Sequence, residues 1–107
     1  MNNQKNIVLC GVGGQGTVLA SKLLAAAAMS KDIPVMSAET IGMAQRGGSV
    51  FSHLRMGNDL YSPMIETGTA DLIIGFEPGE TVRMLPYLKT GGHVVVSTRA
   101  VKPVTAT

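Results

Sequence analysis

Residues 11–16 (GVGGQG) place four glycines directly after a short apolar run, and this feature constrains the fold more than any other. The apolar run at residues 7–10 is typical of a strand buried on both faces, and good helix formers dominate from Thr17 to about Lys31. Glycine permits a tight turn, and its missing side chain lets a backbone approach a phosphate or a neighbouring element closely. The sequence therefore predicts a strand–turn–helix unit that opens a parallel α/β domain.

The remaining apolar segments continue this pattern. We expect further strands at residues 33–37, 49–56, 71–76 and 93–97, a short paired strand at 60–62, a helical segment at 77–85 and a turn at 89–92. The predicted fold is a single α/β domain over residues 1–107, with a Rossmann-like, mainly parallel sheet and flanking helices. Because no helical pattern follows the last predicted strand, we expect the sheet to be incomplete at its C-terminal side.

Composition and charge argue against several classes of protein. The net charge is only +2 and the basic residues are scattered, so we expect no nucleic-acid partner. The most apolar helical stretch, residues 18–29, is short and interrupted by Ser21 and Lys22, so we expect no membrane segment and a cytoplasmic location. The single cysteine, Cys10, cannot by itself ligate an iron–sulfur cluster or form an internal disulfide.

The residues alone leave two interpretations of the glycine segment. Gly11, Gly13 and Gly16 match the spacing of a dinucleotide fingerprint, and Glu39, just past the second predicted strand, is placed to accept a hydrogen bond from a ribose hydroxyl. This pattern favours an NAD(P)-binding oxidoreductase. The same glycines also fit a close-packed turn that binds no nucleotide.

Polar side chains near the strands are weaker candidates. His53 and Arg55 share one strand face with Phe51, where they could meet a substrate or a partner chain. A lone histidine, however, is more often a hydrogen-bonded structural residue. Cys10 is expected to be an inert buried thiol, and no catalytic residue or metal ligand is assigned.

Three segments of the chain together resemble a known family. Residues 11–16, residues 39–50 (ETIGMAQRGGSV) and residues 52–55 (SHLR) are similar to the gamma-type domain of 2-oxoacid:ferredoxin oxidoreductases, and most closely to its indolepyruvate branch. The segments keep the family's order and spacing, and the resemblance spans essentially the whole chain. Because the family's domain continues well beyond residue 107, residues 1–107 correspond to the N-terminal portion of that domain.

The resemblance implies one subunit of an oxidoreductase complex that acts on an oxo group and uses an iron–sulfur protein as electron acceptor. The implied reaction is oxidative decarboxylation of an arylpyruvate, such as indolepyruvate, to an aryl-acetyl-CoA, with electrons passed to ferredoxin. Thiamine diphosphate, Mg²⁺ and the Fe–S clusters are expected in a larger partner subunit, so this chain alone binds no cofactor and is inactive by itself. A non-catalytic interaction subunit is the other alternative, since seven methionines suit an adaptable contact surface.

The resemblance also changes the ligand expected at the glycine segment to coenzyme A or the partner's cofactor pocket. Backbone and amide donors can reach a phosphate there, and the guanidinium of Arg46 suits bidentate binding of phosphate or carboxylate. Gln45 and Arg46 can equally serve to order their own loop. The candidate cofactor-binding residues are Gly11, Gly13, Gly14, Gln15, Gly16, Glu39, Gln45 and Arg46.

Overall fold

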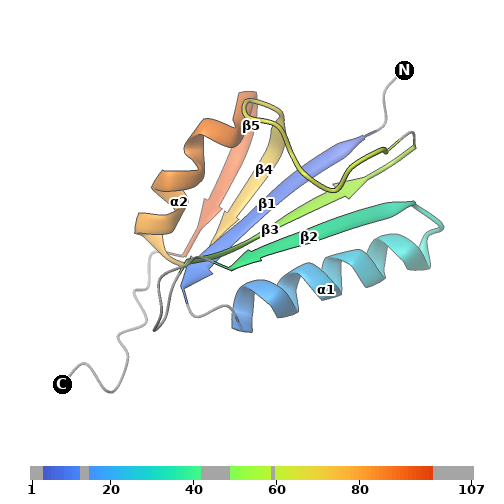
Figure 1. Ribbon diagram of the computed structural model, residues 1–107, viewed down its shortest axis with the longest axis horizontal. Coiled ribbons are helices and arrows are strands. Elements are labelled where there is room, and N and C mark those ends of the chain that lie inside the picture. The colour runs from blue at the N-terminus through green and yellow to red at the C-terminus, as the bar shows by residue number, and fades with distance from the viewer. Residues whose placement is uncertain (1–3, 13–14, 42–48, 59, 98–107) are drawn as a thin grey trace.

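The computed structural model describes residues 4–12, 15–41, 49–58 and 60–97, and Figure 1 shows a single sheet flanked by helices. Its elements are β1 (Lys5–Val12), α1 (Gln15–Ser30), β2 (Val35–Ile41), β3 (Ser49–Met56), β4 (Ala70–Gly75), α2 (Pro78–Met84), the 3₁₀ helix η1 (Leu85–Tyr87) and β5 (Leu88–Val96). The mixed α/β fold is therefore confirmed, and β1 is followed by α1 as the sequence predicts.

The five strands form one sheet in the order β2-β3-β1-β4-β5. β1 pairs in parallel with β4, and β4 pairs in parallel with β5. β3 runs antiparallel to both of its neighbours, β1 and β2, so the other four strands share one direction. The sheet is therefore mixed, with two parallel and two antiparallel strand pairs, and β3 is its antiparallel strand. The short strand predicted at 60–62 is wrong, because those residues form no strand.

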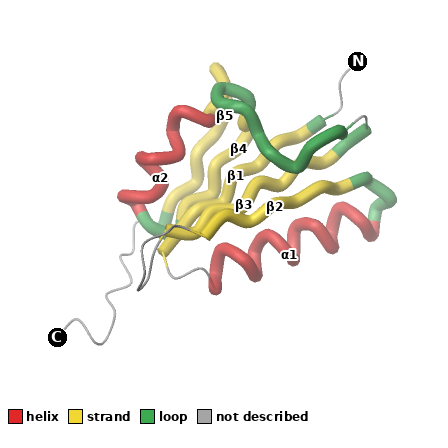
Figure 2. Tube along the Cα trace, in the orientation of Figure 1, coloured by secondary structure: helices red, strands yellow, loops and turns green. Residues whose placement is uncertain are grey.

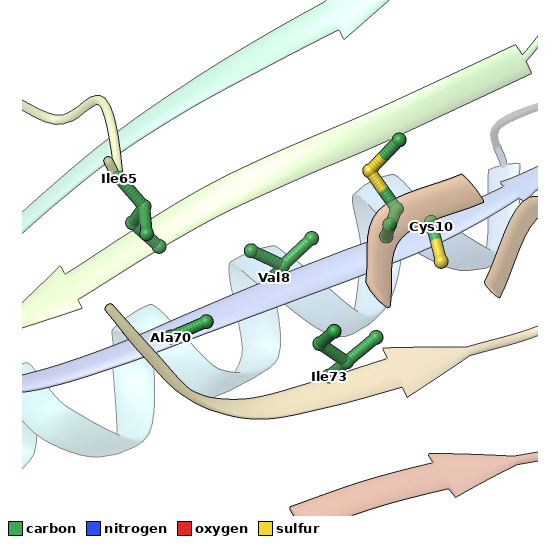
Figure 3. Packing of buried hydrophobic residues seen from close by; sticks show 6 residues of the cluster. Val8, Cys10, Ile65, Ala70 and Ile73 are labelled. Atoms are coloured by element: carbon green, nitrogen blue, oxygen red, sulfur yellow. The ribbon is translucent and has the colours of Figure 1, made fainter. Parts of the chain in front are cut away.

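One face of the sheet is covered by α2 and by the connection between β3 and β4. Val8 and Cys10 of β1 pack there with Ile73 of β4, Met84 of α2 and Ile65 of the connection. Figure 3 shows the side chains from β1 and β4 pointing to the same side, with Ile65 beside Val8. Helix α2 and the irregular connection between β3 and β4 thus bury this face together.

The opposite face is covered by α1. Ile7 and Leu9 of β1 form a second cluster with Leu54 of β3, and Leu24 of α1 packs against it. Small residues bring the helix close to the sheet, and Ala28 is buried as the alanine-rich pattern predicts. Successive residues of β1 therefore point to opposite covered faces, and α1 and α2 lie on different sides of the sheet (Figure 2).

Two elements, β2 and β5, have a boundary that differs from the prediction by more than two residues. β2 runs to Ile41, so Glu39 lies inside the strand and not just past it. β5 begins at Leu88, and the predicted turn at 89–92 is instead an irregularity within the strand. The pairing shifts between Ala70 and Leu72 of β4, and Gly91 has a φ of 84°. Extra residues on one strand of a pair produce a bulge of this kind, which glycine accommodates.

Polar side chains tie together the edge at which β1 and β4 begin. Arg55 Nε donates to Asn6 Oδ1 at 3.0 Å, and Arg55 Nη1 donates to the Ser62 carbonyl at 2.9 Å. The Asn6 N–H donates to Asp71 Oδ2 at 2.8 Å, and Asp71 also pairs with Lys89. These contacts give Arg55 a structural role.

Candidate functional site

The candidate site is the edge of the sheet at which β1 and β4 end (Figure 1). The chain crosses one face from β1 to β2 through α1, and it crosses the other face from β4 to β5 through α2. In open α/β sheets, ligands bind outside the carboxyl ends of two neighbouring strands whose connections diverge in this way. The strand order therefore makes the residues that follow β1 and β4 the candidate binding residues.

Gly11 is held tightly at the end of β1. A Cβ atom at this position would lie 2.7 Å from Thr17 Oγ1 and 3.3 Å from Phe76 Cβ. The N–H of Phe76 donates to the Cys10 carbonyl at 2.8 Å, so the residue after β4 is fixed against β1. Gly11 thus permits a close approach, and its described neighbours are the protein's own α1 and β4.

The other members of the glycine segment are placed differently. Gly16 lies in the first turn of α1, and a Cβ there would meet no atom within 4 Å. In the dinucleotide fingerprint, the third glycine allows the helix to pack closely on the strand. Here Gly11, the first glycine, makes that close contact and Gly16, the third, does not. Gln15 is the first residue of α1. Gly13 and Gly14 lie outside the described residues.

A second close contact, which the sequence interpretation missed, lies at the end of β4. A Cβ at Gly75 would overlap Thr81 Oγ1 and lie 2.8 Å from Thr81 Cβ. In both strands a threonine lies six positions after a glycine that is the last or next-to-last residue of the strand, and Thr17 and Thr81 are both buried. The sequence does contain a signal that could have predicted this contact. The spacing of Gly11 to Thr17 is repeated in that of Gly75 to Thr81, and both pairs follow an apolar run.

The residues that follow β4 form the N-terminal cap of α2. Glu77 is the N-cap residue, and its Oε1 accepts the Glu80 N–H at 2.8 Å. Hydrogen bonds from the Gly79 and Glu80 N–H groups lower the pKa of Glu77 below its usual value. Val12, the last residue of β1, and Phe76, which precedes Glu77 in the chain, leave apolar surface exposed. The described part of the edge offers backbone groups and apolar side chains, which suit binding more than proton transfer.

Glu39 is further from β1 than the dinucleotide fingerprint requires. It pairs with Ser52 of β3, and Ser52 in turn pairs with Leu9 of β1. Two strand spacings therefore separate the backbones of Glu39 and Leu9, about 10 Å in all. In dinucleotide-binding folds the strand that carries the acidic residue lies directly beside the first strand. The insertion of β3 argues against the nicotinamide interpretation.

Gln45 and Arg46 lie outside the described residues. The described residues on either side of residues 42–48 show where that segment begins and ends: Ile41 pairs with Val50, and Ser49 pairs with Val12. The segment therefore leaves β2 and enters β3 at the same edge at which β1 ends. Strand direction brings two of the three resembling segments to one edge of the sheet.

His53 and Cys10 have internal partners. His53 is fully buried, and its Nδ1 accepts the Ile65 N–H at 2.9 Å. Cys10 Sγ lies 3.9 Å from Thr81 Oγ1, and burial raises the pKa of the thiol despite that contact. A buried thiol with a raised pKa is a poor nucleophile.

No group of three or more His, Cys, Asp or Glu side chains within the described ranges is placed to hold a metal ion. Among the helices that the structure describes, none is long and apolar enough to cross a membrane.

Comparison with known sequences identifies similar proteins. A family model described as pyruvate ferredoxin/flavodoxin oxidoreductase matches residues 6–107. Indolepyruvate oxidoreductase subunit IorB from Pyrococcus horikoshii is 46% identical over 99 residues, which cover 92% of this chain and 49% of that protein. The IorB subunit from Archaeoglobus fulgidus is 46% identical over 102 residues, covering 95% of this chain and 50% of that protein. The chain thus spans about half the length of these curated relatives.

Solved structures share the fold at low sequence identity. The gamma subunit of a keto/oxoacid ferredoxin oxidoreductase from Geobacter sulfurreducens has a TM-score of 0.64 and 24% identity, covering 88% of this chain and 50% of that one. A 2-oxoglutarate:ferredoxin oxidoreductase from Magnetococcus marinus, solved with 2-oxoglutarate, coenzyme A and succinyl-CoA bound, has a TM-score of 0.78 and 21% identity. The match covers 96% of this chain and 18% of that larger one.

Proposed function

Because this chain belongs to the pyruvate ferredoxin/flavodoxin oxidoreductase family, we propose that it is a subunit of a 2-oxoacid:ferredoxin oxidoreductase complex acting on indolepyruvate and related arylpyruvates. The observation that carries the proposal is the 46% identity to an indolepyruvate oxidoreductase subunit over 92% of the chain. The reaction converts an arylpyruvate and coenzyme A into an aryl-acetyl-CoA and CO₂, and two electrons pass to ferredoxin. We place this complex in the cytoplasm.

The cofactors of the reaction belong to a larger partner subunit in this proposal. Thiamine diphosphate with Mg²⁺ supplies the carbanion chemistry of decarboxylation, and Fe–S clusters carry the electrons to ferredoxin. The chain has one cysteine, and its thiol is buried against Thr81, which supports placing the clusters elsewhere. This chain contributes a binding surface, so it is inactive without the partner.

We assign that surface to the edge at which β1 ends. Gly11 to Gly16 and the segment that carries Gln45 and Arg46 face coenzyme A or the partner's cofactor pocket. The backbone donors of Gly13 and Gly14, the Gln15 amide and the Arg46 guanidinium suit phosphate groups. Glu39, two strands from β1, takes a more distant hydroxyl of the same ligand.

Reconstitution tests the proposal. The chain is co-expressed with the larger subunit, and arylpyruvate- and CoA-dependent dye reduction is measured with and without the chain. Activity that requires both subunits is expected. Equal activity without this chain would refute the subunit role.

Variants test the assigned surface in the same complex. Arg46→Ala is expected to raise the KM for coenzyme A while assembly stays intact. Lys31→Ala, which changes an exposed cation at the far end of α1, is the matched control and is expected to leave that KM unchanged. An Arg46→Ala complex with unchanged KM for coenzyme A but weakened assembly would favour a purely structural interaction subunit.

The interaction-subunit alternative has one observation in its favour. Leu19, Leu23 and Met29 of α1 are each more than half exposed, so the outer side of this helix is apolar. The nicotinamide alternative predicts saturable NAD(H) or NADP(H) binding by the isolated chain in calorimetry. No binding is expected, since β3 separates Glu39 from β1.

A further inference from the structure

The buried histidine of β3 holds part of the chain through a single ring nitrogen. His53 Nδ1 accepts the Ile65 N–H at 2.9 Å, and neither the ring nor the bond is open to solvent. Phe51 lies 5.7 Å from the ring and Tyr87 lies 5.5 Å away in an edge-on arrangement, both between ring centroids. The imidazole thus sits in an apolar, aromatic environment and bonds to the backbone of a segment that has no regular secondary structure.

The protonation state of the ring follows from this bond. An Nδ1 atom that accepts a hydrogen bond carries no proton, so the proton of the neutral ring is on Nε2. Nε2 is buried and has no hydrogen-bond partner among the described residues. A second proton would have to bind at Nδ1, where it would point at the Ile65 N–H. Two donors cannot share a hydrogen bond, so protonation of His53 and its bond to Ile65 exclude each other.

The segment that His53 holds is also anchored on either side. Arg55 Nη1 donates to the Ser62 carbonyl at 2.9 Å, and Asn6 Nδ2 donates to the Thr69 carbonyl at 3.1 Å. As chemical groups, a guanidinium and a carboxamide keep the same charge between pH 4 and pH 8. Between these anchors, Ile65 places its side chain in the core cluster and is only 4% exposed. The His53 bond is therefore the acid-sensitive contact within an otherwise pH-insensitive attachment.

We propose that His53 is an acid-sensitive latch: protonation releases Ile65 and its neighbours from the sheet while the Ser62 and Thr69 anchors hold. The release uncovers the apolar surface formed by Phe51, Val8 and Tyr87, on the face shown in Figure 3. The opening is local, because α1 and the opposite face of the sheet take no part in it.

The surroundings of the ring favour the neutral, latched state near neutral pH. The titratable and charged groups on the described elements packed around it are Lys5 and Cys10 on β1, Arg55 on β3, Tyr61 and Glu66 in the connection, Asp71 on β4, Glu80 and Arg83 on α2, and Tyr87 on η1. Arg55 is bonded elsewhere, Glu66 is exposed, and Glu80 lies 3.9 Å from Arg83. Burial lowers the pKa of His53 below its ordinary value of 6.5. The latch is therefore fully closed above pH 6.5 and opens as the pH falls through the lowered pKa.

Amide hydrogen exchange of the full chain tests the latch. The Ile65 amide is followed by NMR as the pH is lowered, and the amides of Val8 and Ile73 report global unfolding. After correction for intrinsic exchange, protection of Ile65 is expected to fall by up to tenfold per pH unit below 6.5, while Val8 and Ile73 stay protected. Loss of protection at all three amides together, or at none, would overturn the proposal.

Two variants and one wild-type measurement complete the test. His53→Gln keeps an acceptor but cannot titrate, so its Ile65 protection is expected to be independent of pH in the same range. His93→Gln removes the other histidine of the chain and is expected to behave like wild type. Should His53→Gln not fold, the ¹⁵N shifts of the wild-type His53 ring decide: an Nδ1–H tautomer, or protonation without loss of Ile65 protection, refutes the latch.

Discussion

Replacing Gly75 with alanine should destabilise the protein by about 2–3 kcal/mol, because the new methyl group has no room. The added Cβ would overlap Thr81 Oγ1 and lie 3.0 Å from Thr81 Cγ2. Overpacking of this kind costs about 1–3 kcal/mol, and a displaced Thr81 hydroxyl loses its bond to the Glu77 carbonyl, worth about 1 kcal/mol. The reduced entropy of the unfolded chain offsets about 0.4–1 kcal/mol of this cost.

Gly16→Ala is the matched control, because it adds the same methyl group where no atom lies within 4 Å. Gly16 lies in α1, and alanine is favoured over glycine in a helix by about 0.8–1.0 kcal/mol. The two glycine-to-alanine substitutions should therefore change stability in opposite directions. Urea denaturation followed by far-UV circular dichroism measures both, and the melting temperature should fall by about 10–20 °C in Gly75→Ala.

A double mutant shows whether the steric explanation is correct. Thr81→Ala removes Oγ1 and Cγ2 from the contact, so Gly75→Ala should cost at least about 1 kcal/mol less in that background. Full additivity of the two substitutions would refute the reasoning. So would a Gly75→Ala protein as stable as wild type.

Further outcomes follow from the polar contacts and from the burial of Cys10. Asp71→Asn should lower the free energy of unfolding in urea by about 1–2 kcal/mol, because the Asn6 N–H loses a charged acceptor. Lys89→Ala should lower it by less than about 1 kcal/mol, because the ion pair between Lys89 and Asp71 is partly exposed. Burial alone raises the pKa of Asp71, but hydrogen bonds from Lys89 and Asn6 outweigh it and hold the pKa below 3.8. The stabilisation by the ionised Asp71 carboxylate is therefore complete above pH 3.8 and is lost as the pH falls through the lowered pKa. A pH series of the same denaturation curves measures this loss. A free energy of unfolding that does not change with pH in this range would contradict it. Glu77→Gln should weaken the cap of α2 and remove the contribution of the Glu77 carboxylate to the loss of stability at acidic pH. An unchanged dependence of the unfolding free energy on pH would show that the cap does not contribute. Cys10 should react with a thiol reagent at the rate of unfolding, because the thiol is 1% exposed, and rapid labelling of the folded protein would contradict its burial.

Local patterns predicted the elements whose residues carry a clear period. Strict alternation over residues 49–56 predicted β3 at both of its ends, and the apolar run before the glycine segment predicted β1. The same patterns carry no information about which strands are neighbours. The place of β3 between β1 and β2, and its opposite direction, depend on pairing between distant segments.

Much of the candidate site depends on such distant contacts. The close approach at Gly11 was predicted from its type and position, but its neighbours Thr17 and Phe76 come from α1 and from the end of β4. Glu39 was assigned by its position just past the second predicted strand, but β3 lies between that strand and β1. His53 was expected to be structural, yet its partner Ile65 lies in a segment without any periodic pattern. The ligands of Gln45 and Arg46 stay predictions.

The central position of β1 also determines the order in which the chain can assemble. β1 is synthesised first, but both of its partners, β3 and β4, emerge from the ribosome much later. β2 and β3, in contrast, are close in sequence and pair antiparallel, so they can form without waiting for any other strand. β1, whose residues 7–10 are all apolar and buried, therefore stays unpaired until β3 and β4 have been synthesised. During that interval its exposed edges are open to chaperones and to aggregation.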